Sequence, residues 1–246
     1  MPDQRVAIVT GGARGIGAAI TTALAKSGVH VAAGYSSNAK AAEELAGKLG
    51  AEGASVSVHQ GNVGEPDDCK RVVDEVLADK GRVDYLVNNA GVTVDKTMRK
   101  MSVEDWHAVL RVNLSGAFYM TKCVLDHMTG NKFGRIVNIS SVIGQTGNIG
   151  QVNYAASKAG LFGFTQSLAR ETANKGVTVN CVAPGYIETE MVAAVPQEAL
   201  DKIVARIPVG RLGQAHEIAR AVQFLVDDDA GFITGSVISV NGGMDM

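Results

Sequence analysis

Thr10-Gly11-Gly12-Ala13-Arg14-Gly15-Ile16-Gly17 stands near the N-terminus, between a β-branched run, Arg5–Thr10, and a stretch of helical periodicity, Ile16–Ser27. Glycines let the backbone turn sharply and approach a ligand, and the first turn of a helix offers free N–H groups and a partial positive charge. A glycine-rich turn could serve the chain reversal alone, but four glycines within seven residues exceed that need. The stretch therefore predicts a turn that binds the pyrophosphate of a dinucleotide.

The rest of the chain alternates short apolar runs with helical stretches. Strands are predicted at Arg5–Thr10, Val29–Ala33, Ser55–Gln60, Val83–Asn88, Arg135–Ser140, Thr178–Val182 and Val237–Val240. Helices are predicted at Ile16–Ser27, Lys40–Leu49, Pro66–Lys80, Val103–Met128, Asn153–Lys175 and His216–Leu225. This order indicates one α/β domain over residues 1–246, a doubly wound, seven-stranded parallel sheet with helices on both faces. Residues 185–211 break the rhythm with two prolines and are expected to form a substrate lid.

The composition excludes several classes of function. The chain has 23 Lys and Arg against 25 Asp and Glu, so a net charge of -2 gives no basic field for nucleic acid or an anionic membrane. No apolar run approaches the roughly 18 residues that span a bilayer, and the early strand-like run leaves no room for a signal peptide. Three widely separated cysteines suit a reducing cytosol, so we expect a cytoplasmic protein. The five histidines show no metal-ligand spacing; we expect them on the surface and predict no metal site.

The residues that follow the second strand indicate the kind of nucleotide. A site for NAD normally offers an acidic residue to the ribose 2′-hydroxyl. Here the chain reads Gly34-Tyr35-Ser36-Ser37-Asn38-Ala39-Lys40, with no acidic residue before Glu43. The hydroxyls, the amide and Arg14 suit a 2′-phosphate, so NADP(H) is the predicted cofactor. The same stretch is also typical of a surface turn and helix cap, which does not exclude that role.

A series of motifs extends over essentially the whole chain. T-G-x-x-x-G-x-G occupies Thr10–Gly17, N-N-A-G occupies Asn88–Gly91, Tyr-x-x-x-Lys occupies Tyr154–Lys158, and P-G is Pro184-Gly185. In this order and spacing the motifs resemble those of the short-chain dehydrogenase/reductase family, which has a Rossmann-type fold. Tyr-x-x-x-Lys alone would often be an exposed helical pair, but the joint pattern is specific.

The resemblance implies the residues of the site. The catalytic set would be Asn113, Ser141, Tyr154 and Lys158, with Ser141 preferred over Ser140 because of its spacing to the tyrosine. The cofactor site would comprise Gly11, Gly12, Ala13, Arg14, Gly15, Ile16, Gly17, Tyr35, Ser36, Ser37, Asn62, Val63, Asn88, Asn89, Ala90, Gly91, Tyr154, Lys158, Pro184, Gly185, Ile187 and Thr189. Asn62 departs from the family pattern, because most relatives have aspartate before this valine.

The chemistry of the tyrosine and lysine follows from their spacing. Tyr154 and Lys158 are four residues apart, so they share one face of a helix. A lysine ammonium about 4 Å away would lower the tyrosine pKa, ordinarily near 10, by up to about three units. Tyr154 would protonate a carbonyl oxygen, and Ser141, at the end of the fifth strand, would hydrogen-bond the same oxygen. The resemblance implies that Lys158 also holds the ribose hydroxyls and that Asn113, within a helix, holds a water. The alternative is a helix cap for Ser141 and core packing for Tyr154.

Within the family the chain most resembles reductases of 3-oxoacyl thioesters, at Asn148–Tyr154, Pro184–Ile187, Arg211–Gly213 and Val240–Met244. Gly61–Val63, Val92–Met101 and Pro208–Arg211 favour acetoacetyl-CoA reductases of polyhydroxyalkanoate synthesis, which implies formation of (R)-3-hydroxybutyryl-CoA. The implied substrate contacts are Asp95, Ser141, Gln145, Asn148, Gln151, Tyr154 and Tyr186. A 3-oxoacyl-[acyl-carrier-protein] reductase of fatty-acid synthesis is the alternative, with Arg99, Lys100 and Arg135 as basic groups for an acidic carrier.

Other classes of function are also considered. A non-catalytic NADP(H)-binding regulator would be expected to lack Ser141, Tyr154 or Lys158, and all three are present. For a sugar, steroid or polyol dehydrogenase, the missing acidic residue after the second strand argues against the NAD-dependent members. Helices Val103–Met128 and Asn153–Lys175 carry more apolar residues than one sheet face covers, including Leu161, Phe162, Phe164 and Leu168. The resemblance implies that these helices pair in a homotetramer, in which residues 244–246 meet another subunit.

Overall fold

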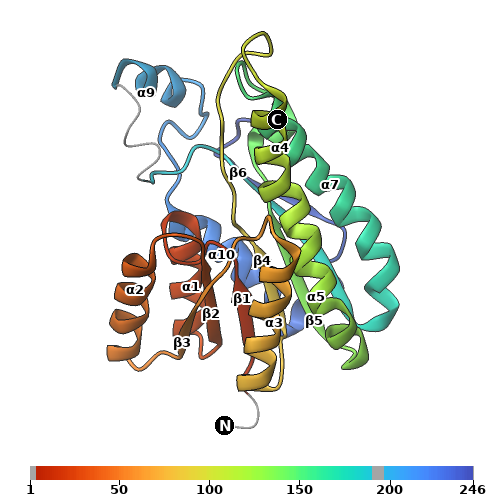
Figure 1. Ribbon diagram of the computed structural model, residues 1–246. Coiled ribbons are helices and arrows are strands. Elements are labelled where there is room, and N and C mark those ends of the chain that lie inside the picture. Colours follow the sequence, from red (N-terminus) through yellow and green to blue (C-terminus); the bar gives the residue numbers. More distant parts are fainter. Residues whose placement is uncertain (1–3, 190–196, 246) are drawn as a thin grey trace.

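Seven parallel strands form the central sheet of the computed structural model, which describes residues 4–189 and 197–245 (Figure 1). The strands are β1 (Val6–Val9), β2 (His30–Tyr35), β3 (Val56–Gln60), β4 (Tyr85–Asn88), β5 (Gly134–Ile139), β6 (Val177–Pro184) and β7 (Val237–Val240). Their order across the sheet is β3-β2-β1-β4-β5-β6-β7. Each overlaps a predicted strand, and the predicted doubly wound fold class is confirmed.

Helices cover both faces of this sheet. They are α1 (Gly15–Lys26), α2 (Ala39–Ala51), α3 (Pro66–Lys80), α4 (Val103–Leu110), α5 (Gly116–Gly130), α6 (Val142–Thr146), α7 (Val152–Thr172), α9 (Gln197–Val204) and α10 (Ala215–Val226). The predicted helix Val103–Met128 is interrupted by a π-helical turn, η1 (Arg111–Ser115), between α4 and α5. In the two described ranges no helix is both long and apolar enough to cross a membrane.

Two apolar cores hold the layers together. One lies under α1 and α10 and includes Ile20, Leu24 and Leu225, and the other lies under α3 and α5 and includes Val76 and Val124. Because both faces of the sheet are covered, several of its strands are apolar almost throughout, such as β1 and β4, as the sequence indicated. β1 pairs with both β2 and β4, so the strand order reverses there and leaves a crevice at the carboxyl ends of the strands.

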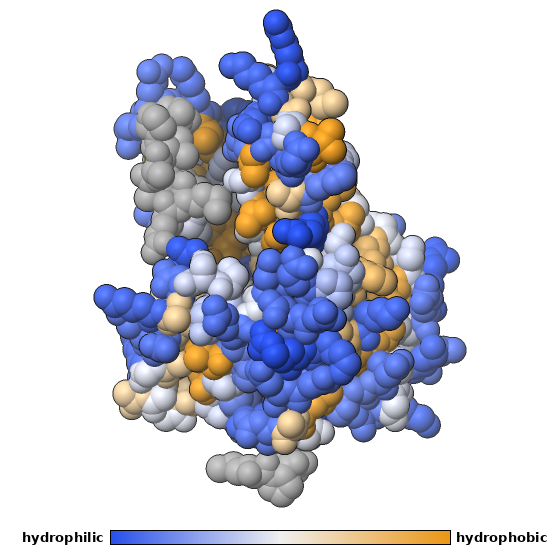
Figure 2. Space-filling view, viewed as in Figure 1, coloured by the Kyte–Doolittle hydropathy of each residue, from blue (hydrophilic) through white to orange (hydrophobic). Residues whose placement is uncertain are grey.

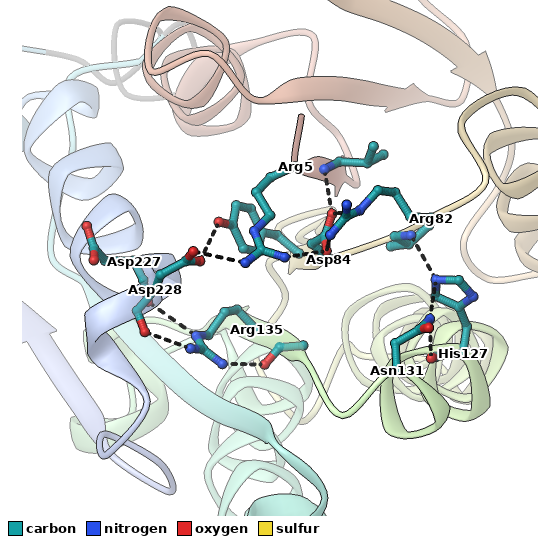
Figure 3. A network of polar contacts seen from close by, with 12 residues as sticks. Arg5, Arg82, Asp84, His127, Asn131, Arg135, Asp227 and Asp228 are labelled. Carbon is teal, nitrogen blue, oxygen red and sulfur yellow. Dashed lines mark hydrogen bonds and ion pairs between the residues drawn. The ribbon is translucent and has the colours of Figure 1, made fainter. Parts of the chain in front are cut away.

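A polar network joins the opposite, amino ends of the strands (Figure 3). The carboxylate of Asp84, 6% exposed, accepts hydrogen bonds from Arg82 at 2.6 and 2.8 Å and from Arg5 at 3.2 Å. Arg5 also donates to Asp228 at 2.9 Å, and the buried guanidinium of Arg135 donates to the backbone carbonyl of Asp228 at 3.1 Å. These bonds tie β1, β5 and the segment after α10 together at the end of the sheet remote from the crevice.

His30 was predicted to lie on the surface with the other histidines, and this prediction is wrong. It is 3% exposed in β2, a strand that β1 and β3 cover on either side. Its Nδ1 lies 2.7 Å from Ser55 Oγ, and its Nε2 lies 3.1 Å from Ser57 Oγ. Burial lowers the pKa of His30 to about 4, and the nearby Lys80 ammonium contributes in the same direction. The imidazole is therefore neutral at physiological pH.

The predicted lid, residues 185–211, includes α9 (Figure 1). Residues 190–196 of this segment lie outside the described residues. Beyond α9 the backbone N–H of Val209 donates to Gly242 O at 3.1 Å, which holds this part of the segment against the C-terminal turn. Closure of the segment over a substrate stays a prediction.

Candidate active site

A cavity of about 990 Å³ crosses the carboxyl ends of the strands, from the turn after β3 to the segment after β6. It brings together most of the predicted site residues: Gly11, Ala13, Arg14, Gly15, Ile16, Gly17, Tyr35, Ser36, Ser37, Asn62, Val63, Asn89, Ala90, Gly91, Ser141, Gln151, Tyr154, Lys158, Pro184, Gly185, Tyr186, Ile187 and Thr189. The others lie outside the cavity wall: Gly12, Asn88, Asp95, Asn113, Gln145 and Asn148. Open parallel sheets bind ligands at this edge.

The glycine-rich turn combines backbone freedom with close packing. Gly11 and Gly15 have φ of +60° and +51°, a conformation that favours glycine. A Cβ on Gly17 would stand 2.0 Å from Gly11 O, and one on Gly12 would stand 2.7 Å from Val9 O. These two positions therefore let α1 approach β1, while Gly12 itself faces away from the cavity. The first turn of α1 has no side-chain cap and no acidic residue, so its N–H groups suit a pyrophosphate.

The end of β2 gives the cavity a polar wall without a carboxylate. Tyr35, Ser36, Ser37 and Asn38 line it, and Asn38 Oδ1 also accepts the N–H of Ala41 at 3.0 Å to cap α2. Hydroxyl and amide groups beside the start of a helix are hydrogen-bond donors for an anion. The residues present therefore fit the 2′-phosphate of NADP(H).

Three polar side chains meet where α6 and α7 pack together near the end of β5. Ser141 was predicted to lie at the end of the fifth strand. β5 ends at Ile139, however, so Ser141 lies in the connection that follows and caps α6. Its Oγ accepts the N–H of Ile143 at 3.1 Å, and its side chain lines the same cavity as the Tyr154 phenol. Lys158, one turn along α7, donates from Nζ to Ile139 O at 2.8 Å.

The predicted lowering of the Tyr154 pKa by Lys158 is wrong for this structure. Burial raises the pKa of Tyr154 above its ordinary value, and the hydrogen bond with Ser141 opposes this only in part. Lys158 Nζ lies 5.7 Å from the centre of the tyrosine ring, and burial lowers the pKa of Lys158 to about 8. Desolvation penalises the charged form of each group and is the largest cause of both shifts. The phenol consequently stays protonated at neutral pH, the form that a general acid requires.

Asn113 lies behind the cavity wall in the π-helical turn η1. Its Oδ1 accepts the N–H of Val92 at 2.8 Å, and its Nδ2 donates to Val92 O at 3.0 Å and Ser157 Oγ at 3.1 Å. A Cβ on Gly91 would stand 3.4 Å from both Asn113 Oδ1 and Lys158 Nζ. Gly91 therefore lies between these two polar groups and in contact range of both. Such π-helical turns occur frequently at functional sites.

The segment after β6 forms the far wall of the cavity. Gly185 donates its backbone N–H to Val240 O at 3.0 Å. A Cβ on Gly185 would stand 2.8 Å from Asn241 Cα, so the turn after β7 lies directly behind this wall. Asn241 lies within Val240–Met244, but its sequence context predicted no role for it. Nothing local in the sequence signals this contact, because it joins two backbones far apart in the chain.

The predicted substrate residues other than Ser141 and Tyr154 fall into three groups. Gln151 and Tyr186 line the cavity, whereas Asp95 and Asn148 contact it only through Gln151. Gln151 Nε2 lies 3.1 Å from both carboxylate oxygens of Asp95, and Asn148 Nδ2 donates to Gln151 Oε1 at 2.8 Å. Gln145 instead donates to Ser239 Oγ at 3.0 Å, and its Oε1 is buried without a hydrogen-bond partner.

The two asparagines of the N-N-A-G motif have different surroundings. Asn89 Nδ2 donates to Thr10 O at 2.9 Å and Gly11 O at 3.1 Å, which holds the glycine-rich turn in place. Asn88 is buried and donates to Asn138 Oδ1 at 2.9 Å and Thr121 Oγ1 at 3.2 Å. Asn88 thus ties β4 to β5 in the core. Among the described residues no group of three or more His, Cys, Asp or Glu side chains is arranged to hold a metal ion.

Known proteins resemble this chain over its whole length. The family model described as short chain dehydrogenase matches residues 5–200. The chain is 52% identical to the acetoacetyl-CoA reductase of Shinella zoogloeoides, with 98% of each chain covered, and 51% identical to that of Cupriavidus necator, with 99% of each covered. It is 46% identical to the 3-oxoacyl-[acyl-carrier-protein] reductase of Escherichia coli, over 99% of this chain and 98% of that protein.

Proposed function

The chain belongs to the short-chain dehydrogenase family and is an oxidoreductase acting on CH–OH groups; we propose that it reduces a 3-oxoacyl thioester, acetoacetyl-CoA, to (R)-3-hydroxybutyryl-CoA with NADPH. The observation that carries the proposal is that Ser141, Tyr154 and Lys158 line one cavity together with the uncapped start of α1. The similarity to acetoacetyl-CoA reductases over almost the whole chain supports this choice of substrate.

Each of the three side chains has a distinct task in this reaction. Bound NADPH would supply the hydride that reaches the carbonyl carbon. Tyr154 donates its phenolic proton to the substrate oxygen, and its raised pKa keeps that proton available until then. Ser141 hydrogen-bonds the same oxygen and orients it. Lys158, protonated below about pH 8, stabilises the phenolate that remains, and Asn113 is proposed to hold the water that returns a proton.

NADPH is the proposed cofactor because of the wall formed by the end of β2. Tyr35, Ser36 and Ser37 offer hydroxyl donors, and no carboxylate among them repels a 2′-phosphate. Gly34→Asp, which places a carboxylate at the end of β2, should narrow the preference for NADPH over NADH. Equal kcat/KM values with NADPH and NADH in the unmodified protein would contradict this assignment.

The choice of thioester depends on polar contacts, because a short acyl group buries little apolar area, worth about 0.8 kcal/mol per CH₂. Gln151 and Tyr186 are the groups in the cavity wall for the thioester and its pantetheine arm. Tyr186→Phe should therefore raise KM more than it lowers kcat, because it removes binding common to ground and transition states.

The second candidate is a 3-oxoacyl-[acyl-carrier-protein] reductase, which the 46% identity to the Escherichia coli enzyme favours. Of the basic residues expected to meet a carrier protein, Arg135 does not qualify, since it is 4% exposed at the amino end of β5 (Figure 3). Arg99 and Lys100 are exposed and remain available. NADPH oxidation should be measured side by side with acetoacetyl-CoA and acetoacetyl-carrier protein, with chiral analysis of the product. A preference for the carrier-protein thioester above about tenfold in kcat/KM would make this second candidate the function.

A homotetramer is proposed as the assembly. Leu161 and Leu168 are buried in the subunit's own core, but Val103 and Phe118 on α4 and α5 are 66% and 47% exposed. Figure 2 shows apolar surface on this side of the molecule, beside the hydrophilic surface of α3. A monomeric mass by light scattering at micromolar concentration would refute the assembly. The proposed compartment is the cytoplasm, which suits three cysteines that form no disulfide bond.

A further inference from the structure

A chain of hydrogen bonds runs from the outer face of α3 to the turn after β3. Arg71 donates to Glu75 Oε1 at 2.8 Å, to Asp68 Oδ1 at 2.9 Å and to Gln60 O at 2.8 Å. The second oxygen of Asp68 accepts the backbone N–H of Asn62 at 2.9 Å. Arg71 thereby connects helix α3 to β3 and, through the carboxylate of Asp68, to the backbone of Asn62.

The other end of this hydrogen-bond network, Glu75, is also hydrogen-bonded to β3. His59 Nδ1 lies 2.9 Å from Glu75 Oε2, and its Nε2 lies 3.0 Å from Ser57 Oγ. The two oxygens of Glu75 are thus bonded to Arg71 on the helix and to His59 on the strand. An isolated exposed ion pair contributes little to stability, but a network with several fixed partners holds its geometry.

The Asn62–Val63 turn lines the cavity, together with His59 and Asp68 of this network. Asn62 Oδ1 accepts the N–H of Gly64 at 3.0 Å, and Cys69 Sγ donates to Val63 O at 3.3 Å. The oxygen of the Asn62 amide is therefore engaged within the turn, and its Nδ2 is the donor that remains for a ligand. Any displacement of the backbone at Asn62 moves this donor directly.

The position of the turn identifies the half of the cofactor that it meets. β3 is the edge strand, four strand spacings from β5, or about 19 Å at roughly 4.8 Å each. The reacting ring must lie beside Tyr154, at the β5 end of the cavity. A dinucleotide that spans the cavity consequently leaves its adenosine half beside Asn62.

We infer that Arg71 and Glu75 are positioning residues for the adenosine half of the cofactor. Neither side chain lines the cavity, yet Arg71 holds Asp68 directly and Glu75 holds Arg71. Asp68 in turn orients the N–H and hence the side chain of Asn62. Residues on the outer face of α3 would therefore set the affinity for the nucleotide without touching it. This inference rests on the proposed use of NADPH.

The test measures binding of adenosine 2′,5′-bisphosphate, the adenosine half of NADP, by calorimetry. Arg71→Met keeps the apolar stem but removes all three hydrogen bonds, and should raise the Kd about three- to tenfold, the range expected when a charge-assisted hydrogen bond behind a binding group is lost. Glu75→Gln, a second variant, should act in the same direction. Arg71→Lys should restore binding only in part, because an ammonium lacks the planar fork. Asp74→Asn is the matched control: it breaks the neighbouring Lys70–Asp74 ion pair on α3 and should leave the Kd unchanged.

Steady-state kinetics gives a second readout. Arg71→Met should raise the KM for NADPH with kcat unchanged, and turnover with reduced nicotinamide mononucleotide, which lacks adenosine, should equal that of the unmodified protein. Equal binding of the bisphosphate by Arg71→Met, Asp74→Asn and the unmodified protein would overturn the inference and leave the proposed function standing. If the unmodified protein fails to bind the bisphosphate, both the NADPH assignment and the inference are wrong.

Discussion

Replacing His30 by glutamine should make the stability of the fold less sensitive to acid. The fold holds the pKa of His30 at about 4, whereas the unfolded chain has the ordinary value of 6.5. The unfolded chain therefore binds the proton first, so the stabilisation is complete above about pH 6.5 and falls as the pH drops toward 4. The free energy of unfolding lost in this way amounts to at most about 2 kcal/mol at pH 5 and about 3 kcal/mol near pH 4, at about 1.36 kcal/mol per pKa unit.

The assay is urea unfolding at pH 7.5 and at pH 5, at one fixed protein concentration, followed by the fluorescence of Trp106. Glutamine keeps a polar group between Ser55 and Ser57 but cannot titrate, so the variant should lose less free energy of unfolding between the two pH values. His107→Gln, at an exposed position on α4, is the control and should behave like the unmodified protein. Equal losses for the unmodified protein and His30→Gln would show that the buried imidazole does not carry this acid sensitivity.

Three further predictions concern the site. Tyr154→Phe retains the ring but removes the acid, so turnover should fall by at least about 10²–10⁴ with NADPH binding intact; turnover above a tenth of normal would exclude Tyr154 as the acid. The kcat/KM for NADPH should decline above about pH 8 as Lys158 loses its proton, and a flat profile from pH 7 to 9 would contradict that role. Gly185→Ala places a Cβ 2.8 Å from Asn241 Cα, so it should cost about 1–3 kcal/mol in thermal unfolding and weaken NADPH binding. Gly47→Ala on α2, where the added Cβ meets nothing within 4 Å, is its control and should be neutral or stabilising.

Much of the site was predictable because its signals are local. The glycine-rich turn lies between adjacent elements, and the tyrosine and lysine share a helix face because they are four residues apart. The absence of an acidic residue after β2 is likewise visible in a few consecutive letters. Covalent connection alone brings such groups together, so sequence spacing suffices to predict their proximity.

The errors share a different cause. The Tyr154 pKa was predicted to fall, but it rises, because residues distant in the chain bury the phenol and desolvate it. His30 was expected on the surface, but neighbouring strands cover it. The position of Arg135 at the remote end of the sheet depends on the direction in which β5 runs. Each of these outcomes depends on which segments pack together.

The sequence by itself determined the order of strands and helices, the place of the glycine-rich turn between β1 and α1, and the shared helix face of Tyr154 and Lys158. Periodicity and short-range spacing suffice for these because they act within one element or between neighbours. Only the tertiary structure decided the contact of Gly185 with Asn241, the hydrogen bonds of Gln151 to Asp95 and the link from Arg71 to Asn62. These contacts, like the burial that sets the ionisation of Tyr154 and His30, arise when separate elements close around a common core. Desolvation and packing depend on everything within a few ångströms of a group, and that neighbourhood exists only after the chain has folded.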